Sequence, residues 1–128
     1  MHALGRHVLL ELRDCDPEIL NDLDFLKHCL LDTAEQIGAT VLGECFNQFS
    51  PQGVSGVVII SESHLCIHTW PEYGYAAVDV FTCGQTVDPI KAIKPIVKRI
   101  GSKDASFTEL KRGVLKNNQV VVSQHERP

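Results

Sequence analysis

Residues 54–83 read VSGVVIISESHLCIHTWPEYGYAAVDVFTC, and this stretch decides the fold. Runs rich in Val, Ile and aromatic residues at 54–61, 65–70 and 75–83 predict three strands. Residues 71–74 separate the last two runs and contain the proline and glycine that are typical of a turn. Connections as short as these join antiparallel neighbours, so the stretch predicts consecutive antiparallel strands.

On the N-terminal side, residues 7–12 alternate between apolar and polar and predict a first strand. Asp16 and Pro17 are typical of a helix start, with an N-cap followed by proline at the first helical position. Apolar residues at helical spacing continue from there up to Gly38, which is a natural stop. Residues 39–49 then read as a second extended segment.

On the C-terminal side, Asp88 and Pro89 repeat this start signal. An apolar stripe over residues 90–100 predicts a second helix that ends at Gly101. Pro95 lies inside the stripe and is expected to bend or shorten the helix. Two further segments follow, a strand at 107–110 and a strand or tail at 119–123.

This order of elements predicts an α/β (α+β) fold in a single domain spanning residues 1–128. The sheet is expected to be mostly antiparallel because its strands follow one another closely. Two amphipathic helices cover only one face of such a sheet, which predicts a two-layer sandwich. The other face of the sheet must then meet water or a second subunit.

Composition and charge exclude several classes of protein. Apolar residues make up 44% of the chain, which is enough for a core, and the formal net charge of −4 argues against a nucleic-acid or anionic-membrane partner. The longest apolar run, residues 56–60, is far too short to cross a bilayer. Residues 1–6 do not lead into a signal-peptide core, so the sequence predicts a cytoplasmic protein.

The cysteines are odd in number, and no two of them have the C-x-x-C spacing. A disulfide framework is therefore not expected, and at least one thiol stays free. Taken singly, each is best explained as a small buried hydrophobe. They are Cys15, Cys29, Cys45, Cys66 and Cys83.

A metal site is the first interpretation of the reactive groups in the strand region. His64, Cys66 and His68 are two residues apart, so a straight strand would place all three on one face. Imidazole and thiolate are good zinc ligands. Against this, His64 is expected in the preceding turn, and a fourth ligand would have to come from Cys83 or Glu72.

A Ser-His-Asp hydrolase is the second interpretation, with Ser63, His68 and Asp79 supplying the residue types. The sequence has no G-x-S-x-G elbow, however, and the glycines of residues 53–56 have the wrong spacing. The predicted strands also do not place the serine between a strand and a helix. This interpretation is the weakest of the three.

Self-processing is the third interpretation. A serine at a tight bend between two strands can attack the carbonyl that precedes it and form an ester. β-Elimination of that ester leaves a dehydroalanine, which hydrolyses to a pyruvoyl group at a new N-terminus. Its ketone reacts with a substrate amine and serves as an electron sink for decarboxylation, which no coded side chain can do.

Resemblance selects among the three. Residues 53–65 and 67–84, together with residues 4–7, closely resemble the prokaryotic S-adenosylmethionine decarboxylases. The likeness covers about residues 4–100 and fades after Gly101. Cys66 stands where the family would have Thr or Ser, which implies no catalytic duty for this thiol.

The resemblance implies that the chain cleaves itself between Glu62 and Ser63. Cleavage would leave residues 1–62 as a β chain and residues 63–128 as an α chain whose first residue is the pyruvoyl group. Glu62 becomes the new C-terminus, and its side chain needs no role. His68 would take the proton during β-elimination, a task that suits an imidazole titrating near neutral pH.

The resemblance also implies roles for four other side chains. Ser55 would hydrogen-bond the ester intermediate, and Cys83 would protonate the substrate carbon after CO₂ leaves. Glu72 would accept hydrogen bonds from both ribose hydroxyls of the substrate. Phe49 would stack on the adenine ring.

The implied enzyme is a homodimer with its active site across the two-fold axis, made of the pyruvoyl group and Cys83 from one protomer and Phe49, Ser55, His68 and Glu72 from the other. The implied reaction converts S-adenosylmethionine (AdoMet) to decarboxylated AdoMet, the aminopropyl donor for spermidine. Relatives that keep the processing serine decarboxylate arginine or ornithine, so these substrates stay open as alternatives. A non-enzymatic partner protein that binds a metal or AdoMet is a further alternative.

Overall fold

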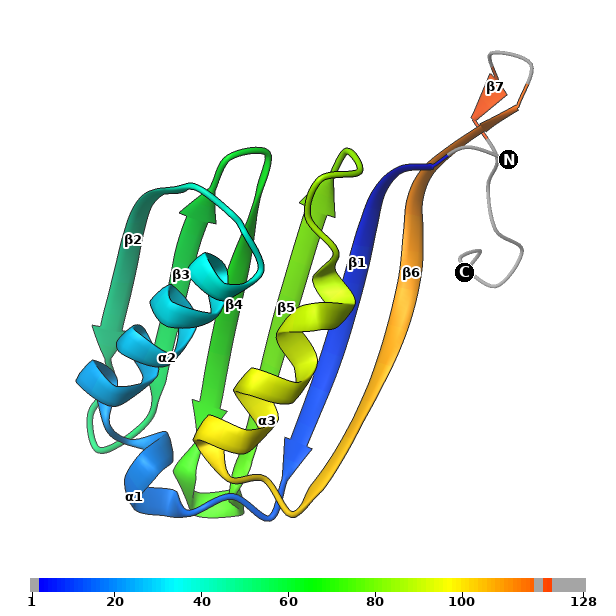
Figure 1. Ribbon diagram of the computed structural model, residues 1–128. Helices are drawn as coiled ribbons and strands as arrows, with labels where there is room; N and C mark the ends of the chain where they lie inside the picture. The colour runs from blue at the N-terminus through cyan, green and yellow to red at the C-terminus, as the bar shows by residue number, and fades with distance from the viewer. Residues whose placement is uncertain (1–2, 117–118, 121–128) are drawn as a thin grey trace.

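The computed structural model describes residues 3–116 and 119–120. Within them, seven antiparallel strands form one sheet in the order β2-β3-β4-β5-β1-β6-β7 (Figure 1). The strands are β1 (Ala3–Arg13), β2 (Val41–Gln48), β3 (Val54–Ile60), β4 (Ser63–Trp70), β5 (Tyr75–Cys83), β6 (Asp104–Lys116) and β7 (Gln119–Val120). The helices are α1 (Pro17–Leu20), α2 (Leu23–Gln36) and α3 (Ile93–Ile100), with 3₁₀ turns η1 (Pro71–Tyr73) and η2 (Pro89–Ala92).

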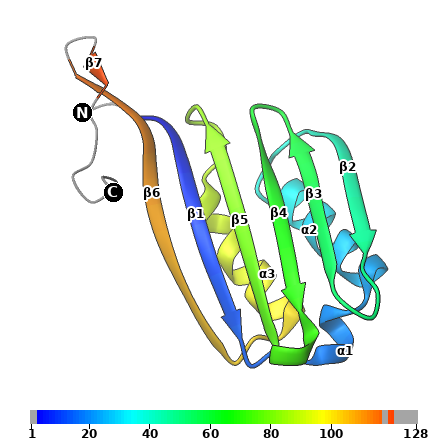
Figure 2. The ribbon, with the colours of Figure 1, turned by 180° about the vertical axis from the view of Figure 1, so that it is seen from behind.

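The three helices lie on the same face of the sheet, and the view from behind shows the other face bare (Figure 2). The predicted two-layer α/β sandwich is therefore confirmed. No helix in the described part of the chain is long and apolar enough to cross a membrane. The bare face is called the open face below; it carries Ser55 on β3, His64, Cys66 and His68 on β4, and Cys83 on β5.

Alternation along the strands sets which side chains reach the open face. In β3, β4 and β5 every second residue is buried beneath the helices, as Val58, Leu65 and Val80 are, all fully buried. The residues between them point the other way because successive side chains of a strand alternate faces. His68, between the buried Ile67 and Thr69, therefore reaches the open face.

The predicted first helix is wrong in one respect, because the structure divides it into α1 and α2. Asp22 interrupts it, since its carboxylate accepts a hydrogen bond from the Phe25 N–H at 3.1 Å and starts a new helix as its N-cap. The preceding Asn21 leaves the helix, and its side-chain oxygen accepts a hydrogen bond from the Gly53 N–H at 2.9 Å. This bond ties the end of α1 to the start of β3.

The predicted second helix also begins later than Asp88 and Pro89, the residues that indicated its start. Pro89 opens the 3₁₀ turn η2, and α3 starts at Ile93. Pro95 therefore lies in the first turn of α3, where a backbone N–H has no partner within the helix, and the helix is shorter than predicted, which is one of the two effects expected of Pro95. The strand predicted at 107–110 is longer, as β6, while of residues 119–123 only the first two lie within the described residues.

Candidate active site

The β3–β4 hairpin places Ser63 directly after a tight turn. Ile60 pairs with Ser63, so Ser61 and Glu62 alone make the connection. Glu62 has a φ of 72°, in the left-handed region that favours glycine. Because turns with unfavourable backbone angles persist only when their surroundings hold them, this conformation marks the backbone of Glu62, directly before Ser63, as strained.

Ser63 lies beside Cys83 at this end of the sheet. Ser63 Oγ is 3.2 Å from Cys83 Sγ, a contact between β4 and the last residue of β5. Both side chains are partly exposed. The two residues to which the resemblance gives the pyruvoyl group and proton delivery are therefore neighbours.

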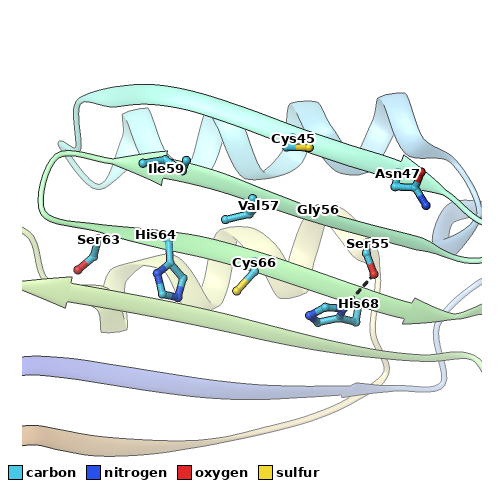
Figure 3. Close-up of a pocket in the computed structure, with 10 residues that line it drawn as sticks. All are labelled: Cys45, Asn47, Ser55, Gly56, Val57, Ile59, Ser63, His64, Cys66 and His68. Carbon is cyan, nitrogen blue, oxygen red and sulfur yellow. Dashed lines mark hydrogen bonds between the residues drawn. The ribbon is translucent and has the colours of Figure 1, made fainter.

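Ser55 and His68 meet at the other end of the hairpin. Their residues pair across β3 and β4, and Ser55 Oγ is hydrogen-bonded to His68 Nδ1 at 2.9 Å (Figure 3). Both line a cavity of about 590 Å³ that runs along the open face as far as Ser63. The structure thus joins a hydroxyl and an imidazole that the sequence could pair only through the resemblance.

A second cavity of about 350 Å³ continues from Ser55 and His68 beyond the end of β4. Phe49 and Glu72 line it, so the structure gathers these two predicted substrate ligands beside the Ser55–His68 pair. Glu72 is set by η1, which ends at Gly74 with a φ of 60°. Phe49 is 49% exposed as a residue and offers its ring for stacking.

The predicted site residues consequently form two groups on one protomer. Ser63 and Cys83 lie at one end of β4, and the group around His68 lies at the other. Ser63 and His68 are five residues apart on one strand, a separation of about 16 Å. A side chain cannot bridge this distance, so the two groups of one protomer do not act on the same atom.

The metal interpretation partly fails on geometry. His64 lies within β4, paired with Ile59, and not in the preceding turn as predicted. His64, Cys66 and His68 do share the open face, yet among residues 3–116 and 119–120 no three His, Cys, Asp or Glu side chains are placed to hold a metal ion. Burial and then the nearby Asp79 raise the pKa of the Cys66 thiol to about 11, so this thiol is protonated at neutral pH.

The hydrolase triad is not assembled. His68 is hydrogen-bonded to Ser55 and is remote from Ser63. The carboxylate of Asp79 instead lies 3.4 Å from the His7 Nε2. The Ser63, His68 and Asp79 set therefore does not form a catalytic triad.

A family model for S-adenosylmethionine decarboxylase matches residues 6–113. The chain belongs to the S-adenosylmethionine decarboxylase family. Its relatives include the S-adenosylmethionine decarboxylase proenzyme of Thermodesulfovibrio yellowstonii, 53% identical over 90% of this chain and 85% of that protein. The proenzyme of Clostridium tetani is 51% identical over 98% of this chain and all of that protein.

Solved structures agree with this membership in the S-adenosylmethionine decarboxylase family. The crystal structure of the adenosylmethionine decarboxylase from Aquifex aeolicus superposes with a TM-score of 0.84, at 30% identity, and covers 93% of this chain and 98% of that one. The likeness also reaches further than the sequence suggested. It does not fade after Gly101, because the family match extends to residue 113.

Two features of this S-adenosylmethionine decarboxylase family member were missed from the sequence. Trp70 lines the cavity with Phe49 and Glu72 and packs on Tyr75 at 5.4 Å between ring centroids. Alternation with the buried Thr69 is the signal that would have placed it on the open face. The other feature is Thr82, which pairs with Ser63 and is buried.

Proposed function

We propose that the chain is a pyruvoyl-dependent AdoMet decarboxylase that makes its cofactor by cleaving its backbone between Glu62 and Ser63. The observation that carries the proposal is the position of Ser63. It directly follows a tight, strained turn and lies 3.2 Å from the Cys83 thiol, in a chain of this family. An acyl shift of this kind requires a hydroxyl on the residue that directly follows a strained turn.

The cleavage can be written from these residues. Ser63 Oγ forms a bond to the carbonyl carbon of Glu62, the C–N bond of the same peptide breaks, and the hydroxyl proton passes to the freed amine. The path through the two-residue turn lengthens, because the chain now runs through Cβ and Oγ of residue 63. This lengthening relaxes the turn that holds Glu62 at positive φ. His68 then removes the α-proton of residue 63, the Cβ–Oγ bond breaks, and Glu62 leaves as a carboxylate. Water then replaces the nitrogen of the resulting dehydroalanine, which leaves as ammonia.

Residue 63 fits the cofactor that results. A pyruvoyl group there supplies a ketone that takes up the substrate amine and accepts the electrons released when CO₂ leaves. The open-face cavity offers space for the pyruvoyl group. The Cys83 thiol lies 3.2 Å from Ser63 Oγ, at the residue that the pyruvoyl group would replace. In this proposal Cys83 delivers the proton that the substrate carbon receives.

A second copy of the chain is needed to complete the site. Cleavage requires His68 near Ser63, and one protomer holds them about 16 Å apart on one strand. Two protomers packed by their open faces, about a two-fold axis that runs between the two sheets and passes over β4 midway between these residues, would bring Ser63 of each to His68 of the other. We therefore propose a homodimer with Ser63 and Cys83 from one protomer and Phe49, Ser55, His68 and Glu72 from its partner.

Recognition of AdoMet is assigned to the cavity at the end of β4. Phe49 offers an exposed aromatic face for adenine, and Glu72 offers a carboxylate for the ribose hydroxyls. Arginine and ornithine have the amine and the carboxylate that the reaction needs but neither an adenine nor a ribose. Family membership favours AdoMet over both, and over a non-enzymatic partner that binds AdoMet or a metal. Cytoplasmic location and the lack of nucleic-acid or membrane partners stay predictions from the sequence.

Glu72→Gln is expected to raise the KM for AdoMet by about ten- to hundredfold, because charged hydrogen bonds to the ribose become neutral ones. Self-cleavage should be unchanged, since the proposal gives Glu72 a part only in binding the ribose and none in the acyl shift or the β-elimination. Release of labelled CO₂ from AdoMet, arginine and ornithine measures the effect. Glu35→Gln, an exposed carboxylate on α2, is the matched control. Faster CO₂ release from arginine or ornithine than from AdoMet by the wild type would overturn the substrate assignment.

A further inference from the structure

Thr82 carries a buried hydroxyl that the chemistry above does not use. The residue is 2% exposed, and its Oγ1 has no hydrogen-bond partner among residues 3–116 and 119–120. Buried hydroxyls are nearly always hydrogen-bonded, because leaving one unpaired destabilises the fold. An unpaired hydroxyl next to a reactive residue therefore points to a partner that forms in another state of the protein.

The neighbour of Thr82 on β1 cannot be that partner. Thr82 pairs there with Arg6, and a guanidinium carries donors and no acceptor. Two of its five N–H donors are bonded, to Glu109 at 2.6 Å and to Asp88 at 3.1 Å. The Thr82 hydroxyl proton consequently finds no acceptor on this side.

The neighbours of Thr82 along β5 offer none either. The side chain two positions before it is Val80, which is apolar, and two positions after it stands Gly84. On the β4 side Thr82 pairs with Ser63. Paired residues have Cβ atoms about 4.5–5.5 Å apart, so groups on residue 63 lie within reach of the hydroxyl. In the uncleaved chain the Ser63 hydroxyl contacts Cys83 instead.

We propose that Thr82 is a positioning residue for residue 63, whose hydroxyl donates a hydrogen bond to the ketone oxygen of residue 63 once the chain has been cleaved. Conversion of Ser63 removes an amine, which is a donor, and adds a carbonyl oxygen, which is an acceptor. The Thr82 hydroxyl is a donor already in place and without an acceptor. Its bond would orient the carbonyl and draw electrons from the carbon that the substrate amine attacks. The inference rests on the proposed function.

Four proteins test the inference: the wild type, Thr82→Val, Ser63→Ala, and the double variant that carries both substitutions. The two proteins with Ser63→Ala cannot cleave themselves. Valine keeps the shape of threonine and replaces the hydroxyl by a methyl group, which cannot form a hydrogen bond. In the uncleaved Ser63→Ala pair, Thr82→Val is expected to raise the thermal midpoint by about 2–5 °C, because it removes an unpaired buried hydroxyl. In the cleaved pair it is expected to lower the midpoint and to slow CO₂ release by about tenfold. Thr82→Ser should restore both towards the wild type.

Each other outcome contradicts the inference. A midpoint lowered equally in both backgrounds would show that the hydroxyl is bonded before cleavage and has a structural role. A midpoint raised in both, with turnover unchanged, would show that residue 63 never binds it. A folded Thr82→Val chain that stays uncut would place the hydroxyl in the cleavage reaction. Intact mass separates these outcomes from a failure of the proposed function, in which the wild type itself is never cleaved and both ideas fall.

Discussion

Ser63→Ala is expected to remain a single chain of 128 residues and to release no CO₂ from AdoMet. Alanine has no Oγ to attack the carbonyl of Glu62, so neither the ester nor the pyruvoyl group can form. Loss of a covalent electron sink removes the reaction outright instead of slowing it. Denaturing gel electrophoresis shows the uncut chain, and labelled AdoMet shows the missing turnover.

Ser61→Ala is the matched control for this variant. Ser61 is a serine of the same two-residue turn, and its backbone N–H donates to the Thr40 carbonyl at 2.8 Å, a bond that alanine keeps. The Ser61→Ala chain should therefore fold and cleave as the wild type does. Cleavage that persists in Ser63→Ala and disappears in Ser61→Ala would show that Ser61, and not Ser63, is the reactive serine.

Cells that produce Ser63→Ala and His68→Ala chains together should yield cleaved protein, although each variant alone stays uncut. In a mixed dimer, Ser63 of the His68→Ala protomer meets the intact His68 of its partner, and that one site is complete. With equal amounts and random pairing, about half of the His68→Ala chains fall in mixed dimers and can be cut. The cleaved fraction of the His68→Ala chains should therefore change from none to about half. This change directly measures whether two protomers share one active site.

The mass of the cleaved fragment shows which of the two variant chains was cut. A fragment of residues 63–128 that carries the His68→Ala substitution identifies the His68→Ala chain as the one cut. Denaturing and refolding the two variants separately before mixing provides the control in which only homodimers form. No cleavage in the co-produced sample would contradict a shared site and would require Ser63 and His68 to meet within one chain.

Local patterns were sufficient to predict the strands of the hairpin, because alternation has a fixed period of two, although His64 was expected in the turn before β4 and lies within that strand. They were not sufficient at Asn21 and Asp22. Both bear on the break between α1 and α2, since Asp22 caps the new helix and Asn21 bonds to Gly53 at 2.9 Å, more than thirty residues away. Such a contact between distant segments leaves no mark on the hydrophobic spacing of the helix.

In the candidate site too, some residues could be predicted from the sequence and others could not. Spacing alone offered His64, Cys66 and His68 as one set, and the resemblance was needed to separate Ser63 from His68. The sheet supplies the physical reason, since five residues of strand hold these two about 16 Å apart. Thr82 could not be found from the sequence at all, because its unpaired hydroxyl depends on what β1 and β4 place on either side of it.

Intact mass measurement of the purified wild-type protein tests the central claim most directly. We expect two fragments, residues 1–62 and residues 63–128, with the second lighter by one ammonia than a fragment that begins with serine, as a pyruvoyl end requires. Its first residue should resist Edman sequencing and react with a hydrazine. A single chain with the mass of all 128 residues that nevertheless decarboxylates AdoMet would contradict the account.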